Sequence, residues 1–268
     1  MKELLTYLFL GLVQGFTEPI PISSSGHIKI FKEILGADFF KDLNFEIIVN
    51  FGSLIAIVIY FRKDIFKLVG DFFLYIKTKS NKYAESFKYC WLIVIGTIPA
   101  GILGLLLKDI IENNLSSVKI TGFALLITAL FLFIIRNYKG HKNENEITYK
   151  DALLIGLFQA VALFPGISRS GATIVGSMFL GLKRDVAFKF SFMLFIPISI
   201  ATMLLGTLDL LESNPSNSLM LYYFIGMLAS LVMTYISTIW FNNIMKKGKL
   251  IYFVVYCLIA GSLTLLFL

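Results

Sequence analysis

An arginine lies among hydroxyl and glycine residues in an otherwise apolar segment, ALFPGISRSGATIVGS (162–177). Arg169 offers a planar fork of N–H donors, which suits bidentate contact with phosphate oxygens. Pro165 stops the preceding helix, so we expect a new helix to begin near Ser168, with its free N–H groups and dipole directed at an anion. The other candidate phosphate ligands here are Gly166, Ser168, Ser170 and Thr173. Together these residues predict an anion site.

A second polar segment, near the N-terminus, carries a carboxylate, an imidazole and three consecutive hydroxyls. Its residues are Glu18, Ser23, Ser24, Ser25, Gly26 and His27, and Gln14 lies one helical turn before Glu18. Pro21 breaks the first helix, and serines are typical of the start of the next one. Phosphoryl transfer needs charge neutralisation, positioning and proton transfer, which these groups could supply if both segments share one cavity.

The composition indicates a polytopic membrane protein rather than a large soluble domain. Of the 268 residues, 57% are hydrophobic and 15% are charged, whereas soluble domains are about 45–50% apolar and about 25% charged. Six apolar runs approach the roughly 20 residues that a helix needs to cross the hydrocarbon layer. They are residues 44–61, 87–107, 118–137, 186–208, 218–241 and 250–267.

Two further apolar regions, 2–35 and 150–181, have polar and proline-containing middles. Backbone that is not helical is tolerated at membrane depth only where protein or a water-filled cavity surrounds it. We therefore expect each region to form a re-entrant helical hairpin. The short run 65–76 has flanking lysines and is predicted to be an interfacial helix. We expect no cleaved signal peptide at 4–17, because no small-residue cleavage site follows before Glu18.

The two broken regions are similar to each other. GLVQGFTEPIPISSSG (11–26) and GLFQAVALFPGISRSG (156–171) match without gaps at seven of sixteen positions. We interpret the chain as one membrane domain, 1–268, built from two homologous halves, 1–145 and 146–268. Each half is one re-entrant hairpin plus three spanning helices. Because three crossings end on the opposite side of the membrane, the second half has the inverted orientation. The predicted fold is all-α, with six spanning helices, two re-entrant hairpins and a site where the hairpins meet.

The distribution of lysine and arginine predicts the orientation. Seventeen of the 24 lysine and arginine residues fall in segments 62–88, 136–150, 181–189 and 242–249, which the predicted repeat places on one side of the membrane. By the positive-inside tendency this side is cytoplasmic, and both termini are outside. The excess of positive charge is thus explained by topology, so membrane lipids are expected partners and nucleic acid is not. The sequence leaves a homodimer open.

Arg169 also has a structural alternative, which is an internal ion pair with Glu18 or Glu46 that locks the two halves together. Ionisable groups at membrane depth are costly and usually functional. We favour anion binding because two helix starts, an arginine, a glutamate and a histidine all belong to one predicted cavity.

Several of these motifs resemble a known family. QGFTE (14–18), PISSSGH (21–27) and PGISRSGAT (165–173) are similar to the signature motifs of bacterial undecaprenyl-diphosphate phosphatases of the bacitracin-resistance type, the BacA/UppP family. FEIIVNFGS (45–53) and FKFSFMLFIP (188–197) also resemble conserved blocks of that family. Two positions depart from its pattern: Gln14 stands where many members have Glu, and Asn50 stands where Gln is expected.

The resemblance implies an enzyme of the bacterial plasma membrane, with an inverted-repeat fold. Its substrate would be the C55 polyprenyl diphosphate, from which it removes the terminal phosphate at the outer face and so recycles the lipid carrier of cell-wall synthesis. The resemblance also implies a divalent cation, Mg²⁺ or Ca²⁺. Glu18 and Gln14 are its candidate ligands, and because they are few, substrate phosphate oxygens would have to complete the shell.

Under this interpretation Arg169 clamps the diphosphate, together with the two helix starts. The nucleophile stays open among Ser24, His27 and a water molecule, and His27 could instead be a general base. Glu18 could alternatively orient His27 or act as an acid or base. The further phosphate-binding candidates are Ser23, Ser25, Gly26, Gly166, Ser168, Ser170 and Thr173. Glu46 and Asn50 are candidates for orienting the residues that contact the substrate. Ordinary interhelical hydrogen bonding is the alternative role.

Two other functions compete with this one. A polyprenyl-phosphate transporter or flippase could share inverted repeats and broken helices, but it would need access from both sides. A lipid phosphatase of the PAP2 type would share only the SSGH element. That type also requires an Arg-Pro pair, and no arginine precedes a proline here.

Overall fold

The computed structural model describes residues 2–36, 44–114, 117–213 and 215–268, without the side chains of 108–114 and 208–213. In these ranges the chain is helical, apart from turns and one isolated bridge between Lys142 and Leu182. The helices are α1 (Lys2–Thr17), α2 (Ser24–Ile34), α3 (Asn44–Tyr60), α4 (Arg62–Thr78), α5 (Ala84–Asn114), α6 (Val118–Ile135), α7 (Tyr149–Val161), α8 (Arg169–Phe179), α9 (Arg184–Ser213), α10 (Asn217–Lys247) and α11 (Ile251–Phe267), with the 3-10 turns η2 (Asn81–Tyr83) and η3 (Glu144–Glu146).

Several of these helices are suited to a bilayer, which confirms the predicted all-α membrane protein. Among the described residues, α6, α9, α10 and the span Asn81–Leu107 are long and apolar enough to cross a membrane. The apolar helix α11 is shorter, with 17 residues. Helices α3 and α4 meet at a bend of 75° and could together make a fifth such span. The chain is therefore a multi-pass membrane protein.

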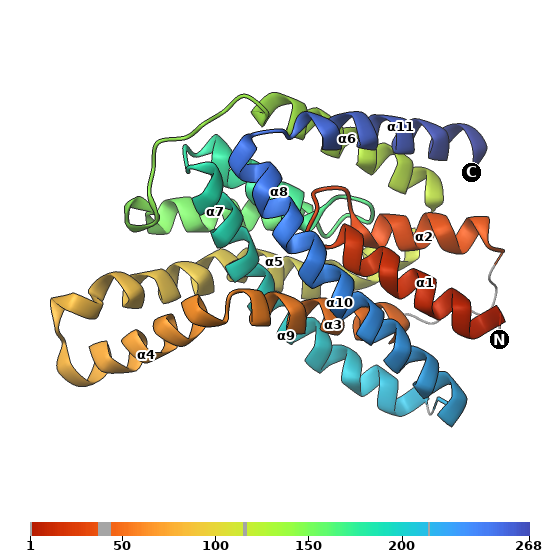
Figure 1. Cartoon of the computed structure of the whole chain (residues 1–268), viewed down its shortest axis with the longest axis horizontal. Coiled ribbons are helices and arrows are strands. Elements are labelled where there is room, and N and C mark those ends of the chain that lie inside the picture. The colour runs from red at the N-terminus through yellow and green to blue at the C-terminus, as the bar shows by residue number, and fades with distance from the viewer. Residues whose placement is uncertain (1, 37–43, 115–116, 214) are drawn as a thin grey trace.

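The run predicted as a short interfacial helix is longer than expected. It forms α4, which begins directly after the bend at Phe61 and projects beside the start of α5 at one end of the molecule (Figure 1). Phe66 and Phe73 are exposed on α4, as expected of a helix with one apolar face at a membrane surface. The charge distribution places Lys41, Lys108, Asp209 and Glu212 on the side opposite the four basic segments, and Lys41 and the side chains of the other three lie outside the described part.

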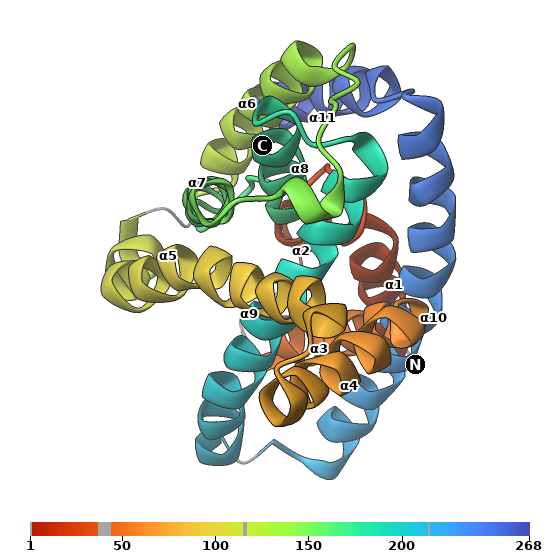
Figure 2. The ribbon, with the colours of Figure 1, turned by 90° about the vertical axis from the view of Figure 1, so that its left-hand side faces the viewer.

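Two helix pairs cross unusually closely, and glycine makes both crossings possible. Helix α1 packs on α10, where a β-carbon added at Gly11 would lie 2.3 Å from the Gly226 carbonyl oxygen. Helix α7 packs on α5, where a β-carbon added at Gly156 would lie 2.4 Å from the Gly96 carbonyl oxygen. Figure 2 shows the two pairs on opposite flanks, with α6 and α11 packed together between them at one edge.

The core is richest in aromatic side chains where α3, α9 and α10 converge. Phe61, Phe188, Phe192 and Phe241 form consecutive ring contacts with centroids 4.7 to 6.0 Å apart. Lys189 lies at the same end of α9 and pairs with Asp64 at 2.8 Å and Glu144 at 2.9 Å. This end of the molecule is therefore packed with aromatic rings and tied by ion pairs.

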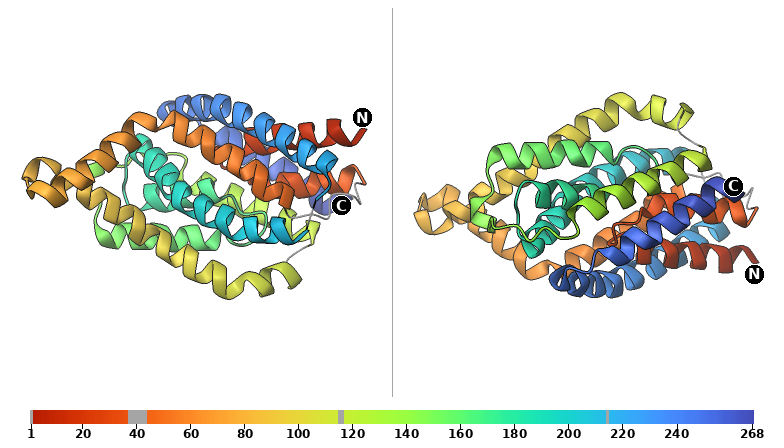
Figure 3. Two further views of the ribbon diagram at one scale, coloured as in Figure 1. Left: turned by 90° about the horizontal axis from the view of Figure 1, so that it is seen from below. Right: turned by 90° about the horizontal axis from the view of Figure 1, so that it is seen from above.

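Two helical hairpins bring polar loops into the interior. Helices α1 and α2 contact each other, as do α7 and α8. In Figure 1 the loop after α1 is reached from the end that carries both termini, and the loop after α7 from the opposite end. The views in Figure 3 show the long helices running beside both hairpins along the longest axis of the molecule. The loops are thus enclosed by helices at mid-length.

Candidate active site

A serine caps the second helix of each hairpin, as the sequence predicted for Ser168. The Ser23 hydroxyl accepts a hydrogen bond from the Gly26 N–H at 3.2 Å, and the Ser168 hydroxyl accepts one from the Gly171 N–H at 3.1 Å. Each cap satisfies one free N–H group of the helix start and leaves others available to a ligand. Gly166, before α8, has a φ of 93°, which favours a glycine.

The two loops are in direct contact. The Ser170 hydroxyl lies 3.4 Å from the Glu18 carbonyl oxygen and 3.3 Å from that of Ile20. A β-carbon built at Gly26 would lie 3.3 Å from Gly166 Cα, so the start of α2 and the loop before α8 approach each other closely. Segments that are about 145 residues apart in the chain therefore form one site.

Glu18 is 9% exposed and receives two side-chain hydrogen bonds on one oxygen. Gln14 Nε2 donates to Glu18 Oε2 at 2.8 Å, and the Ser24 hydroxyl donates a short hydrogen bond to the same oxygen. The predicted spacing of Gln14 and Glu18 on one helix face is thus observed. Because the Ser24 proton points at a carboxylate, Ser24 has a base in contact with it.

His27 is 3% exposed and does not face this pair. Its Nδ1 lies 2.7 Å from the Ser23 carbonyl oxygen, and its Nε2 lies 2.6 Å from the Tyr256 hydroxyl on α11. The two rings stack, with centroids 5.5 Å apart. No sequence pattern indicated a role for Tyr256. A tyrosine in an apolar span is a weak signal by itself, and the two residues lie 229 positions apart.

Arg169 is half-buried at the first turn of α8. Its guanidinium donates to the Ser199 hydroxyl at 3.2 Å and lies 5.2 Å from the centre of the Phe195 ring. Ser199 in turn donates to Asn50 at 3.4 Å, so Asn50 supports the arginine through one intervening residue. None of the ion pairs between described residues includes Arg169, and Glu46 pairs instead with Lys32 at 2.7 Å. The ion-pair alternative for Arg169 is therefore not adopted.

The remaining predicted phosphate ligands differ in their surroundings. Ser168 and Ser170 lie with their hydroxyls 3.2 Å apart beside Arg169. Thr173 is buried, donates to the Arg169 carbonyl at 3.0 Å and contacts the Ser191 hydroxyl on α9. Ser25, in contrast, is exposed. The hydroxyl of Thr173 thus has partners within the fold, whereas Ser25 lies at the surface.

The oxygen atoms near Glu18 are of the type that binds a hard cation, but they are too few to hold one by themselves. Carboxylate, hydroxyl and amide oxygens are the ligands that Mg²⁺ and Ca²⁺ prefer. Among the described residues, however, no group of three or more His, Cys, Asp or Glu is placed to hold a metal. Gln14 turns its nitrogen toward Glu18, so only its oxygen remains as a ligand. Any cation here would need phosphate oxygens from a substrate.

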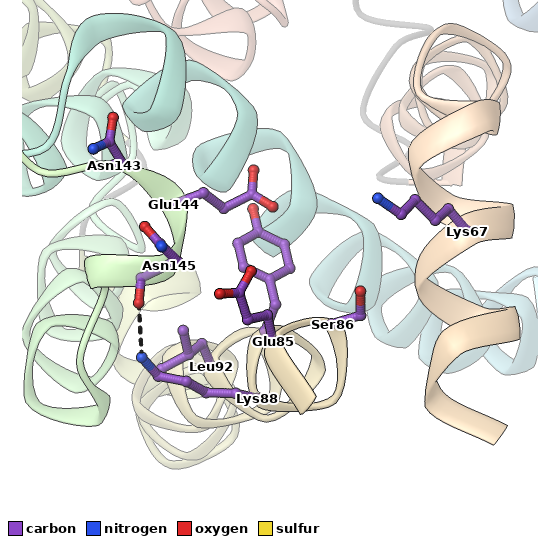
Figure 4. A pocket seen from close by; sticks show the side chains of 9 residues that line it. Lys67, Glu85, Ser86, Lys88, Leu92, Asn143, Glu144 and Asn145 are labelled. Atoms are coloured by element: carbon purple, nitrogen blue, oxygen red, sulfur yellow. Dashed lines mark hydrogen bonds between the residues drawn. The ribbon is translucent and has the colours of Figure 1, made fainter. Parts of the chain in front are cut away.

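A cavity of about 270 Å³ lies away from these loops, between α4, α5 and η3 (Figure 4). Its lining includes Lys67, Glu85, Ser86, Glu144 and Asn145. Across it, Lys88 donates to the Asn145 carbonyl oxygen at 3.0 Å. None of the predicted site residues lines this cavity.

Comparison with protein families matches residues 7–263 to the family described as bacitracin resistance protein BacA. The chain belongs to this family. A BacA-family relative from Bacillus thuringiensis (strain Al Hakam), "Undecaprenyl-diphosphatase 2", is 48% identical over 265 residues, covering 99% of this chain and 98% of the relative. The similar proteins also include "Undecaprenyl-diphosphatase 1" from Bacillus licheniformis at 46%, with 98% of each chain covered, and "Undecaprenyl-diphosphatase" from Oceanobacillus iheyensis at 44%, with 98% and 96% covered. The BacA-family match thus confirms the resemblance read from the motifs.

Proposed function

We propose that this protein is an undecaprenyl-diphosphatase, an enzyme that hydrolyses the terminal phosphate of undecaprenyl diphosphate. One observation carries the proposal: the loop with the Ser24–Glu18 pair contacts the loop that starts the arginine-bearing helix α8. A hydroxyl with a base in contact, in a loop that touches the start of an arginine-bearing helix, is an arrangement suited to phosphoryl transfer. The names of the relatives agree with this chemistry.

In the proposed mechanism the diphosphate lies between the two helix starts, and Arg169 neutralises the charge that develops on the terminal phosphoryl group. Ser24 Oγ attacks the terminal phosphorus, its proton passes to Glu18, and the lipid monophosphate leaves. Water then hydrolyses the phosphoserine, releases inorganic phosphate and restores the serine. Ser24 is preferred to His27 as nucleophile because only Ser24 hydrogen-bonds Glu18.

The proposal keeps Glu18 and Gln14 as the residues that would hold a divalent cation, Mg²⁺ or Ca²⁺. Such a cation would neutralise diphosphate charge when bound. The residues that already surround Arg169 orient the guanidinium: Ser199 holds it by a hydrogen bond, and Asn50 holds Ser199. Glu46 acts on the site only through α2, because it pairs with Lys32.

We also propose the finer membrane arrangement. It has six spanning helices, two re-entrant hairpins, inverted repeats 1–145 and 146–268, and both termini on the outer face of the bacterial plasma membrane. The pair of glycine crossings supports the repeat, because α1 on α10 and α7 on α5 join equivalent elements. The serine caps support it too, since Ser23 and Ser168 are equivalent in the internal alignment.

Hydrolysis distinguishes an enzyme from a flippase. The aromatic cluster around Phe188 and the ion pairs of Lys189 pack the end of the molecule that the charge distribution assigns to the cytoplasm. A hydrolase requires a single opening for its lipid substrate, but an alternating-access transporter also closes one end in each state, so phosphate release decides between the two functions.

Phosphate release from undecaprenyl diphosphate by purified protein tests the function. We expect activity in the native chain and a loss of about 10³-fold in Arg169→Ala, because arginines that stabilise phosphoryl transfer contribute on that scale. Arg62→Ala is the control, since Arg62 is exposed and, among the described hydrogen bonds, donates to a backbone carbonyl, that of Ile59. Normal rates in a folded Arg169→Ala protein would eliminate the proposal.

A further inference from the structure

The imidazole of His27 is held on both sides, by two elements that are distant in the sequence. The Ser23 carbonyl lies 2.7 Å from Nδ1, and the Tyr256 hydroxyl lies 2.6 Å from Nε2. The Tyr256 ring stacks on the imidazole with an interplanar angle of 19°. The proposed mechanism uses Ser24 and Glu18 and leaves this buried imidazole without a role.

The chemistry of the partners fixes which nitrogen carries the proton. A carbonyl oxygen only accepts, so Nδ1 must be the protonated nitrogen of a neutral ring. The Ser23 carbonyl also accepts the His27 backbone N–H at 3.1 Å, as the carbonyl of a helix N-cap does, so it is fixed beside the imidazole. Nε2 then carries the lone pair, and the Tyr256 hydroxyl is the donor to it.

We propose that Tyr256 is a positioning residue, which holds His27 as the Nδ1–H tautomer and covers the lone pair of Nε2. Building on the function proposed above, this arrangement fixes the His27 side chain at the start of α2, the helix whose first residue, Ser24, donates to Glu18. Tyr256 acts through His27 and has no contact with Ser24 or Glu18 among the described hydrogen bonds.

The first test measures whether Nε2 is covered, and it does not depend on activity. Diethyl pyrocarbonate acylates unprotonated imidazole nitrogens, and the chain has only two histidines, His27 and the exposed His141. Acylation of each is followed by peptide mass spectrometry in the full-length protein in detergent, with His141 as internal reference. We expect His27 to react slowly in the native chain and at least several-fold faster in Tyr256→Phe.

The matched control is Tyr252→Phe, one helical turn earlier on α11. Tyr252 is exposed and its ring contact is with Lys249, so its hydroxyl should not protect His27. An unchanged His27 rate in Tyr256→Phe would overturn the proposal. Phe keeps the stacked ring, and a melting temperature equal to that of Tyr252→Phe would show that both variants are folded.

The second test asks whether this positioning serves the reaction. We expect Tyr256→Phe to lower kcat about 10-fold with little change in KM, as the loss of one well-placed hydrogen bond predicts. In a His27→Gln background the same substitution should have no further effect, because Tyr256 acts through His27. Faster acylation with unchanged kcat would overturn the positioning role. Absence of phosphate release from the native chain would reject the proposed function, while the acylation result would still decide whether Tyr256 covers Nε2.

Discussion

The crossing of α7 on α5 predicts the effect of one added methyl group. In Gly156→Ala the new β-carbon would lie 2.4 Å from the Gly96 carbonyl oxygen and 3.0 Å from Pro99 Cδ. Both neighbours belong to rigid helix positions, so neither can rotate away as a flexible side chain would. The two helices must separate by about 1 Å to reach ordinary contact distances of about 3.5 Å.

Gly101→Ala is the control that isolates this clash. Gly101 lies in the same helix as Gly96, and a β-carbon there would meet nothing within 4 Å. Both substitutions gain about 1 kcal/mol of helix propensity, so their difference is the cost of overpacking, about 1–3 kcal/mol. At about 2–4 °C per kcal/mol for a chain of this size, Gly156→Ala should melt several degrees below Gly101→Ala.

The assay is thermal unfolding of the two purified proteins in one detergent, read by tryptophan fluorescence and by loss of phosphatase activity. Gly11→Ala should behave like Gly156→Ala, because its β-carbon would lie 2.3 Å from the Gly226 carbonyl oxygen. Equal melting temperatures for Gly156→Ala and Gly101→Ala would refute the close crossing and, with it, the placement of the second hairpin.

Three further predictions concern the site and the topology. A cysteine at Asn217, in a chain whose two native cysteines are replaced by alanine, should react with a membrane-impermeant thiol reagent in intact cells, and one at Asn81 should not; the reverse labelling would invert the proposed orientation. Ser24→Ala should abolish phosphate release while Ser25→Ala keeps most of it, since only Ser24 contacts a base; equal activities would remove Ser24 as nucleophile. Chelation of divalent cations should stop turnover, Mg²⁺ or Ca²⁺ should restore it, and Gln14→Ala should require a higher cation concentration; full activity after exhaustive chelation would exclude a cation role.

Local patterns were enough to predict the helices that carry the site. Pro21 and Pro165 lie in the loops after α1 and α7, where the prolines predicted helix ends, although Pro99 and Pro197 lie inside α5 and α9. The serines that follow are acceptors for free N–H groups, so Ser23 and Ser168 cap helices as their types predict. Helix ends were less accurate. Helix α10 reaches Lys247, beyond the apolar run that ends at 241, because polar residues continue a helix at no cost in hydrogen bonds outside the hydrocarbon layer.

Hydropathy, helix breakers and the internal repeat are properties of neighbouring residues, so they were sufficient to predict a membrane protein with two related polar hairpins. Which polar groups bond to one another depended on the three-dimensional packing of the helices. Glu18 hydrogen-bonds Ser24 rather than pairing with Arg169, Glu46 forms an ion pair with Lys32, and His27 hydrogen-bonds Tyr256. Hydrogen bonds extend only about 3 Å, so the way in which the helices cross determines which polar groups can meet. The spacing of these residues along the chain does not predict it.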